Sequence, residues 1–516
     1  MPFSRRAFLR VSSVAALAPL WPRVSRSSAD STNSDLCRTL ASDPLRPQYH
    51  LMPAHNWMND PNGPIFFRGR YHMFHQYNPQ AAVWGNMNWA HATSPDLIHW
   101  EHEPIAISPT PNGPDRDGVF SGSAVLDNGK PTMIYTGVAP PRTGAYATLR
   151  DGAHTWVETQ CLAVAHDDDL RTWKKLPGPV IAAPPTGLSV NGFRDPYVWR
   201  EDNSWMLILG SGVNKKGGMV LLYSSLDLRR WTYLHPLVEG SASDNKSVNP
   251  VDSGEMWECP DFFPLGDKHV LLISTMGKVL WKVGSYANRR FTPEKEGVVD
   301  WGSYYAAKTM LDRDGNRILW GWIPETRPDA DLIAAGWAGA MSLPRILSMN
   351  SRRELQTQVA PVVEKLRSAN TRIDSQDDLA KRRAALENVQ IHDLSAEIEV
   401  QLQPKADEFT LRLQSDSGEF ATFSLANQSG SRQLRVNTVS APLSGATGSE
   451  VSLHMFLDGS VLEVFANGTT TLTARIYQIP KGPLRLKLED TSELVSFNVW
   501  QMNPISKNRL TGSLCA

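Results

Sequence analysis

The sequence predicts an all-β protein, a five-bladed β-propeller followed by a C-terminal β-sandwich. From about residue 50 to 350, hairpin signals recur, each with an apolar run, a Gly/Asp/Asn turn and a second apolar run. An Asp-Leu-x-x-Trp motif returns between hairpins, and strict alternation of apolar and polar residues dominates the last third. Five units with two alternating markers favour a propeller over one large irregular sandwich, because a propeller repeats one four-stranded sheet per blade.

The chain has 516 residues, which suits two or three domains. Its formal net charge is −1, with basic and acidic residues balanced. This balance gives no sign of nucleic acid or an anionic membrane as a partner.

The N-terminus has the features of an export signal. Residues 4–10 read SRRAFLR, an apolar stretch follows over 11–21, and Ser27-Ser28-Ala29 offers a cleavage site. We therefore predict a twin-arginine signal peptide over residues 1–29 and export to the periplasm or the outside, the alternative being an unstructured basic terminus. The apolar stretch is too short to span a bilayer. Residues 30–48, rich in Ser, Asp and Thr, are predicted to be a linker.

The propeller is predicted over residues 49–350. The hairpin turns fall at Gly69, Asn128, Asp202, Gly266 and Asp314. The Asp-Leu-x-x-Trp copies are Asp96–Trp100, Asp169–Trp173 and Asp227–Trp231, with a weaker copy ending at Phe291.

Three acidic residues occupy corresponding places in three of these units. Asp60, Asp195 and Glu258 each lie seven to nine residues before a hairpin turn, and a proline follows each at once or one residue later. Inner strands converge on the channel of a propeller, so we expect the three carboxylates to share one funnel. Repulsion and desolvation there raise the pKa of one carboxyl enough for it to act as an acid, while another stays ionised. The other two units place Phe120-Ser121 and Tyr304-Tyr305 at the corresponding position. Hydroxyl groups and aromatic rings at this position are suited to binding a polyol substrate.

Asp60 belongs to the stretch WMNDPNG, Trp57–Gly63. Pro61 fixes its own φ and biases Asp60 toward an extended conformation, and Asn62-Gly63 predicts a sharp turn. A carboxylate on stiff backbone suits a nucleophile. Taken alone, the tetrapeptide Asp-Pro-Asn-Gly is more often a structural turn than part of an active site.

The C-terminal region is predicted to be a β-sandwich over residues 369–516, after a linker over 351–368. Alternating runs such as Phe409-x-Leu411-x-Leu413 have one polar face, and Asp458-Gly459 predicts a hairpin turn. Glu463 is expected to face solvent or the domain interface. The four cysteines form no CxxC pair, so no zinc or redox site is expected. A disulfide between Cys37 and Cys515 is one option, because chain termini are often close together.

The motifs around the three acids resemble those of glycoside hydrolase family 32, the invertase and fructanase family, in the right order and over about residues 48 to 510. Their wording is most similar to the plant acid invertase and fructan exohydrolase branch. The matching stretches are WMNDPNG, WGNMNWAH (Trp84–His91), FSGS (Phe120–Ser123), FRDP (Phe193–Pro196), WECPD (Trp257–Asp261), ILWGW (Ile318–Trp322), GWAGAMSLPR (Gly336–Arg345) and VLEVFANG (Val461–Gly468).

This resemblance implies roles for the site residues. Asp60 would be the nucleophile on the anomeric carbon, and Glu258 the acid that protonates the leaving oxygen and then the base that activates water. Asp195, with Arg194 beside it, would hold fructose hydroxyls and stabilise the transition state. Five further residues would contact the fructose unit: Asn59, Gln76, Trp84, Phe120 and Ser121.

The chain departs from the plant-type pattern in one loop. Plant-type invertases carry an acidic and a basic residue after the WECPD strand, associated with a preference for sucrose. Here the loop Ser274–Lys278 has the lysine and no acid. We therefore expect the leaving-group side to be less polar than in plant-type invertases, with weaker discrimination for sucrose.

The predicted function is therefore that of an exported, retaining glycosidase that hydrolyses terminal β-D-fructofuranosyl residues of sucrose, inulin, levan or short fructans. No metal or cofactor is expected, because two carboxylates carry this chemistry. Three alternatives stay open. A fructosyltransferase would use the same covalent intermediate, although an intact WMNDPNG favours hydrolysis. A non-catalytic fructan-binding protein would not need all three carboxylates, and an inverting arabinan-cleaving propeller would differ around Asp60.

Overall fold

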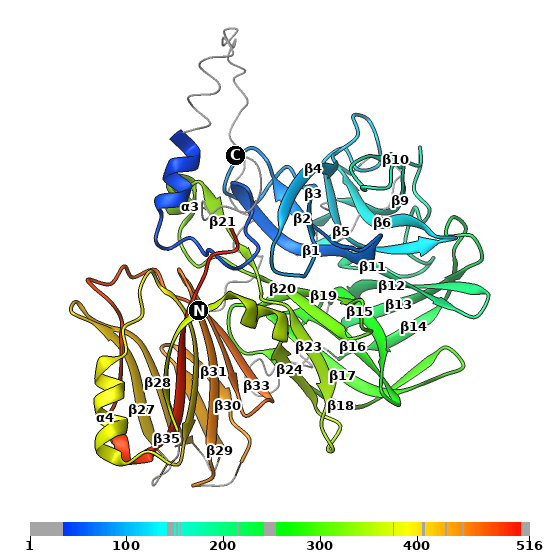
Figure 1. Cartoon of the computed structure of the whole chain (residues 1–516). Helices are drawn as coiled ribbons and strands as arrows, with labels where there is room; N and C mark the ends of the chain where they lie inside the picture. Colours follow the sequence, from blue (N-terminus) through cyan, green and yellow to red (C-terminus); the bar gives the residue numbers. More distant parts are fainter. Residues whose placement is uncertain are drawn as a thin grey trace.

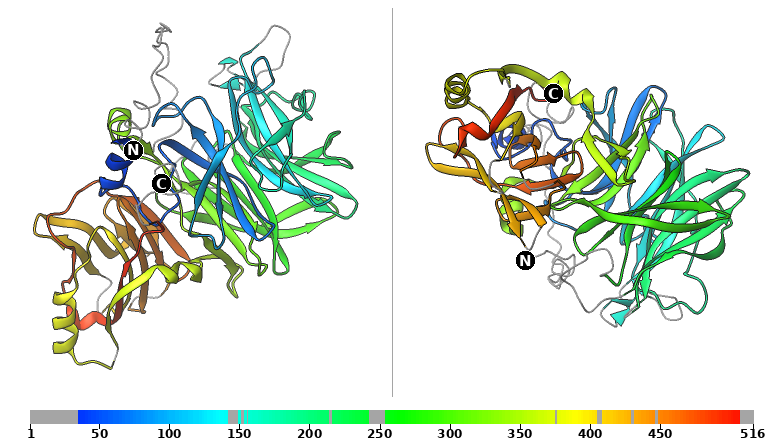
Figure 2. Two further views of the ribbon diagram at one scale, coloured as in Figure 1. Left: turned by 45° about the horizontal axis from the view of Figure 1, so that its top comes forward. Right: turned by 90° about the horizontal axis from the view of Figure 1, so that it is seen from below.

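A computed structural model of the chain describes residues 35–141, 149–150, 153–154, 156–213, 216–241, 254–374, 376–404, 408–428, 431–445 and 448–506. The predicted signal peptide lies outside these residues. A β-propeller (blue to green in Figure 1) stands beside a β-sandwich (yellow to red), and Figure 2 shows the same arrangement from two other sides. The predicted all-β fold of two domains is confirmed.

The propeller consists of five sheets, each built around four antiparallel strands. They are β1 (Asn56–Phe67), β2 (Arg70–Asn78), β3 (Asn88–Ser94) and β4 (Glu101–Ile107); β5 (Gly118–Asp127), β6 (Lys130–Ala139), β9 (Val157–Ala165) and β10 (Trp173–Lys175); β11 (Gly192–Glu201), β12 (Ser204–Val213), β13 (Gly217–Ser225) and β14 (Thr232–Glu239); β15 (Glu258–Leu265), β16 (Lys268–Thr275), β17 (Lys278–Ala287) and β18 (Arg290–Asp300); and β19 (Tyr305–Leu311), β20 (Arg317–Ile323), β23 (Arg345–Met349) and β24 (Leu355–Val359). We number these sheets as blades one to five. The ring is closed after β20, where β22 (Ala340–Met341) pairs with β20 and β21 (Trp337–Ala338) pairs in parallel with β1. A two-stranded sheet of β7 (Leu149–Arg150) and β8 (Ala153–His154) follows β6, and helix α3 (Asp329–Ala335) precedes β21.

The Asp-Leu-x-x-Trp motif forms the turn between the third and fourth strands of blades one to three. In each copy the leucine has a positive φ, and the indole N–H of the tryptophan donates to the leucine carbonyl oxygen. The pairs are Trp100 to Leu97 (2.9 Å), Trp173 to Leu170 (2.9 Å) and Trp231 to Leu228 (3.0 Å). The motif recurs because these three blades use the same closed turn.

The sandwich packs a six-stranded sheet against a five-stranded sheet. In sheet order these are β25 (Arg367–Ile373), β35 (Leu494–Met502), β26 (Ser395–Leu402), β31 (Val451–Asp458), β32 (Val461–Ala466) and β33 (Thr470–Arg475), and β30 (Val439–Pro442), β29 (Ser431–Val436), β28 (Gly418–Gln428), β27 (Phe409–Ser415) and β34 (Arg485–Leu488). Helix α4 (Leu379–Asn388) and the short 3-10 turn η2 (Thr491–Glu493) lie at its edge. The alternating residues Phe409, Leu411 and Leu413 are buried in its core, as period-2 patterning predicts. Asp458-Gly459 turns between β31 and β32, as expected.

Two predicted linkers are structured. Residues 351–368 contain β24 and the 3-10 helix η1 (Pro361–Leu366), so the last blade ends at Val359 and the sandwich begins at Arg367. The strand was missed because glutamines separate its buried positions, Leu355, Thr357 and Val359. In the other segment, residues 35–42 are helical, and Leu40 and Arg46 are buried. The serine-rich composition therefore hid the part of this segment that packs.

The cysteines include one half of the suggested bridge. Cys37 is disulfide-bonded, whereas Cys161 and Cys259 are buried thiols. The suggested partner, Cys515, lies outside the described residues. In the part of the chain that the structure describes, no helix is long and apolar enough to cross a membrane.

The two domains are joined by a buried network of charged groups. Glu463 of the sandwich accepts from Arg345 of blade five through Oε2 (2.6 Å) and faces His50 Nε2 through Oε1 (2.9 Å). His50 Nδ1 lies 2.7 Å from Asp458 Oδ2, and Arg345 also donates to Asp300 at 3.0 Å. Glu463 therefore lies at the domain interface, one of its two expected positions, where GWAGAMSLPR meets VLEVFANG.

This network sets a pH window for stability. Burial opposes the charge on His50, but hydrogen bonds and charges from Asp458 and Glu463 outweigh it and raise its pKa to about 9. Burial acts against the charge on Glu463 too, but Arg345 and His50 lower its pKa to about 2. The contribution of His50 is complete below its unfolded pKa of about 6.5 and is lost as the pH rises through 9. That of Glu463 is present above about 4.5 and is lost as the pH falls toward 2.

We expect Glu463→Gln to lower the free energy of unfolding by about 3–5 kcal/mol near pH 6, because it removes the carboxylate that Arg345 and His50 share in the buried network. Denaturation in urea measures this loss. The matched control is Glu419→Gln, since Glu419 pairs with Arg412 on the sandwich surface, and its loss should stay below about 1 kcal/mol. Equal losses for the two variants would show that the interface network contributes no more than a surface pair.

Candidate active site

The innermost strand of every blade carries a β-bulge at the same level. The register breaks at Met58/Pro61, Phe120/Gly122, Arg194/Tyr197, Glu258/Asp261 and Tyr305/Lys308. Bulges redirect side chains, and here they aim five strands' residues at one end of the channel. The sequence signal for this geometry was the acid-proline pattern.

The sequence predicted equivalent positions for the three acids, but the structure places them at three different positions of their bulges. Glu258 is the last residue paired before its bulge, Asp195 is the first residue inside its bulge, and Asp60 is the second. Asp195 has a φ of +64°, which an aspartate tolerates better than most side chains. Asn62-Gly63 does not form the predicted turn but a second bulge within β1, where Gly63 has a φ of +46°. One-residue offsets let the carboxylates reach one site from different angles.

Asp60 is buried and held at both carboxylate oxygens. Ser121 Oγ donates to Oδ2 at 2.5 Å, and Asn59 Nδ2 donates to Oδ1 at 3.0 Å. Asn59 also donates to Gln76 Oε1 (2.6 Å), and Gln76 donates to Ser121 Oγ (3.0 Å). Three of the predicted fructose-contacting residues thus form a closed ring with Asp60 that fixes its orientation.

Asp195 and Asp60 face one thiol. Cys259 Sγ lies 3.4 Å from Asp195 Oδ2 and 3.5 Å from Asp60 Oδ2. The Cys259 backbone N–H also donates to Asp195 Oδ2 at 2.9 Å, and the Asp195 N–H donates to Thr136 Oγ1 at 2.9 Å. The structure therefore brings these two predicted carboxylates together at one thiol.

Glu258 has different partners. Arg194 donates to its Oε1 through Nη2 (2.8 Å) and Nε (3.2 Å), and Tyr305 donates to its Oε2 at 2.7 Å. Arg194 Nη1 also donates to Glu158 at 2.9 Å. Burial opposes the charge of Arg194, but Glu158, Glu258 and Asp195 outweigh it and raise its pKa. The guanidinium stays charged and is shared between two glutamates.

Sequence reasoning missed Glu158 and gave Cys259 and Tyr305 no specific role. Glu158 is fully buried on β9, a third strand that the acid-proline pattern does not mark. A charged residue inside the run Val157–Ala165 was the one available signal. Tyr304, paired with Tyr305 in the sequence analysis, faces the other way and lies against the Arg345 guanidinium at 4.3 Å.

An aromatic group borders the site. Phe120 lies 6.0 Å from Trp84 and 5.6 Å from Trp156, both in T-shaped geometry. Trp84 keeps partial exposure, as a residue that contacts substrate requires. Trp57, Trp89 and Trp257 are fully buried and belong to the core.

The loop Ser274–Lys278 is a tight hairpin between β16 and β17. Met276 and Gly277 have positive φ values, and Lys278 donates to the carbonyl oxygen of Trp301 beside the sandwich. Burial lowers the pKa of Lys278. Its ammonium is thus committed to a backbone contact, and the loop brings no carboxylate with it.

Among the described residues, one group has spacing suited to a metal ion: Glu397, Glu399 and His454, on the sandwich. Arg367 already pairs with Glu397 at 2.6 Å, so a cation is present there. The carboxylates of the propeller site are not part of this group.

A five-bladed propeller that gathers three carboxylates and an aromatic wall at one end of its channel defines a glycoside hydrolase. The family model for the N-terminal domain of glycosyl hydrolases family 32 matches residues 50–359, and that for the family's C-terminal domain matches residues 362–501. The chain belongs to glycosyl hydrolase family 32, and it is a β-fructofuranosidase-type glycoside hydrolase.

Relatives from bacteria and plants match over most of the chain. A sucrose-6-phosphate hydrolase from Escherichia coli is 36% identical over 84% of this chain and 90% of its own length. A vacuolar acid β-fructofuranosidase from a Rosa hybrid cultivar is 31% identical over 89% and 81%. Among solved structures, fructan 1-exohydrolase IIa from Cichorium intybus is 27% identical, with a TM-score of 0.74 over 89% of this chain and 98% of its own.

Proposed function

We propose that this protein is an exported enzyme that hydrolyses terminal β-D-fructofuranosyl units of sucrose and short fructans with retention of configuration. The observation that carries the proposal is the separate anchoring of two carboxylates at one channel mouth. Asp60 is oriented by Ser121 and Asn59, whereas Glu258 is oriented by Arg194 and Tyr305.

In the proposed first step, Glu258 protonates the glycosidic oxygen while Asp60 attacks the anomeric carbon. The bond to the leaving group breaks, and a covalent fructosyl ester forms on Asp60. In the second step, Glu258 takes a proton from water, which attacks the same carbon and releases fructose and the Asp60 carboxylate. Asp195 binds fructose hydroxyls, and its negative charge stabilises the positive charge that develops in the transition state.

The side of the site that binds the leaving group influences which substrate is preferred. The loop Ser274–Lys278 offers no carboxylate, and Lys278 is held by Trp301, so few polar groups of this loop reach a glucose unit. We therefore expect a kcat/KM for sucrose less than about 10²-fold above that for a trisaccharide fructan, a gap under ~2.7 kcal/mol. A larger ratio would show that this loop does not set the preference.

The deciding experiment is an assay of purified protein on sucrose, sucrose 6-phosphate, inulin, levan and a trisaccharide fructan, with early products followed by NMR. Hydrolysis with β-fructofuranose formed first supports the proposal. New oligosaccharides as main products would favour a fructosyltransferase, and α-fructofuranose would favour an inverting mechanism. Binding without turnover on every substrate would favour a fructan-binding protein.

Export is proposed from the Arg5-Arg6 pair and the apolar run after it. Changing both arginines to lysine should keep the protein in the cytoplasm, because the twin-arginine route recognises the pair. Cell fractionation with activity staining measures this. Unchanged export of the Lys-Lys form would remove the twin-arginine assignment and leave the hydrolase proposal intact.

A further inference from the structure

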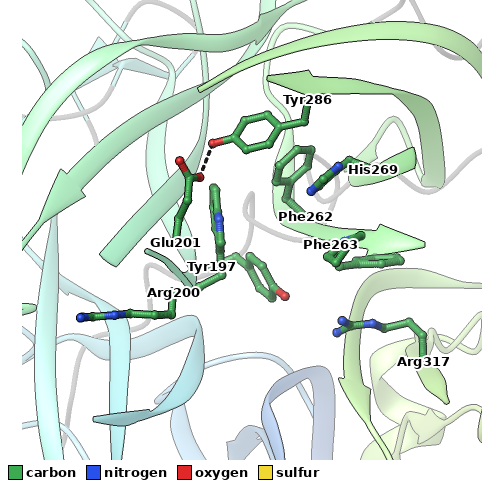
Figure 3. A pocket seen from close by; sticks show the side chains of 10 residues that line it. Tyr197, Arg200, Glu201, Phe262, Phe263, His269, Tyr286 and Arg317 are labelled. Atoms are coloured by element: carbon green, nitrogen blue, oxygen red, sulfur yellow. Dashed lines mark hydrogen bonds between the residues drawn. The ribbon is translucent and has the colours of Figure 1, made fainter. Parts of the chain in front are cut away.

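A second pocket lies at the opposite end of blades three and four from the carboxylates. Its volume is about 350 Å³, within the roughly 300–1,000 Å³ of small-molecule sites. It is lined mainly by aromatic side chains, with one carboxylate: Tyr197, Trp199, Glu201, Phe262, His269 and Tyr286. Figure 3 shows Tyr286, Phe262 and Tyr197 around the same hollow.

This pocket is separate from the active site. Strand β11 carries Asp195 near one end and Glu201 at the other, and β15 runs likewise from Glu258 to Pro264. Six residues of strand span roughly 20 Å at about 3.3 Å each. A ligand bound here therefore does not contact the catalytic carboxylates.

The aromatic rings form one continuous surface. Phe262 lies 5.4 Å from Trp199, 5.1 Å from Tyr286 and 5.2 Å from His269, on which it stacks. Trp199, Tyr286 and His269 keep partial exposure, so ring faces reach the solvent side of the pocket. Such rings pack well against the C–H face of a sugar ring.

The pocket carries charged groups of both signs. Tyr286 Oη donates to Glu201 Oε2 at 2.7 Å, and Arg289 lies 3.5 Å from Glu201 Oε1. Arg200 and Arg317 also line the pocket, and their guanidinium groups lie over the rings of Trp205 (5.0 Å) and Phe263 (4.7 Å). The arginines disfavour a cation, while Glu201 and the apolar rings disfavour an anion. A neutral ligand with both hydroxyls and C–H faces fits this combination.

We propose that this pocket is a remote binding site for one sugar unit of a fructan. The choice of fructan rests on the proposed function, whereas the sugar class rests on the pocket itself. Binding here holds an oligomeric or polymeric substrate on the enzyme between turnovers, which raises its local concentration near the catalytic mouth.

The test counts binding sites. Titration calorimetry of the inactive Asp60→Ala protein with a trisaccharide fructan should give a stoichiometry near two, and Asp60→Ala/Trp199→Ala should give one. In the otherwise wild-type chain, Trp199→Ala should raise KM for inulin several-fold and leave kcat/KM for sucrose unchanged. The matched control is Tyr233→Ala, a half-buried aromatic on β14, the fourth strand of the same blade, that does not line the pocket, and it should change neither value.

Trp199 also packs against a core cluster, so a second variant keeps the test decisive if Trp199→Ala unfolds. Tyr286→Phe removes only the hydroxyl bound to Glu201 and should weaken the second site several-fold. The proposal is overturned if the Asp60→Ala protein binds only one trisaccharide. It is also overturned if that protein still binds two with unchanged affinity after Trp199→Ala and after Tyr286→Phe. If the wild-type chain hydrolyses neither sucrose nor fructan, the proposed function fails, while the site count still decides whether the pocket binds sugar.

Discussion

Asp60→Ala is expected to lose roughly 10⁴–10⁶-fold in kcat on every fructoside, a range typical when the nucleophile of a covalent mechanism is removed. The loss should be similar for sucrose and for an activated aryl fructoside, because both need the covalent ester on Asp60. The ring of Asn59, Gln76 and Ser121 remains but has no carboxylate to orient. Steady-state kinetics on both substrates measure the effect.

Two further observations separate a lost nucleophile from a damaged site. Asp60→Asn preserves the shape of the side chain and should be about as inactive as Asp60→Ala. Added azide should enter the space left in Asp60→Ala and attack from the same face as the missing carboxylate, giving α-fructosyl azide. Substantial activity of Asp60→Asn, or azide rescue that yields the β-azide, would remove Asp60 as nucleophile.

The repeat architecture was predictable because each blade reuses the same local rules. The turns at Gly69, Asn128, Asp202 and Gly266, and the Asp-Leu-x-x-Trp turns, depend on neighbouring residues only. The segments 35–48 and 351–368 were misjudged because their order comes from partners distant in sequence. The backbone N–H of Gln48, for example, donates to Asp458 Oδ1 at 2.7 Å, and Gly459 lies against the backbone of residues 45–46.

The grouping of the candidate site residues was predictable where the acids share a local signature, and it was not predictable where a supporting residue comes from another strand. Asp60, Asp195 and Glu258 are marked by following prolines. Glu158 acts through Arg194 from a third strand, and no spacing rule connects the two. The offset of the three acids within their bulges depends on strand register, which a count of residues to the next turn does not resolve.

Unlike the loss in Asp60→Ala, the loss of activity in Glu258→Ala should depend on the leaving group. Activity on sucrose should fall roughly 10²–10⁴-fold, the usual contribution of general acid–base catalysis. The first step on an activated aryl fructoside should fall far less, because its leaving group departs without a proton. Burst kinetics with the aryl substrate should then reveal an accumulating fructosyl-enzyme, since no base activates water in the second step.

Two further experiments complete this test: interception by azide, and a conservative substitution of Tyr305, which neighbours Glu258. Azide needs no base, so it should intercept the ester in Glu258→Ala from the side of water and yield β-fructosyl azide, the opposite anomer to the Asp60→Ala product. Tyr305→Phe keeps Glu258 and Arg194 but removes one hydrogen bond to Oε2, worth about 0.5–1.5 kcal/mol, so it should cost about tenfold or less. Equal losses of Glu258→Ala on both substrates, with no azide product, would contradict the acid–base role. Arg194 and Tyr305 would then be anchors of a carboxylate that only binds substrate.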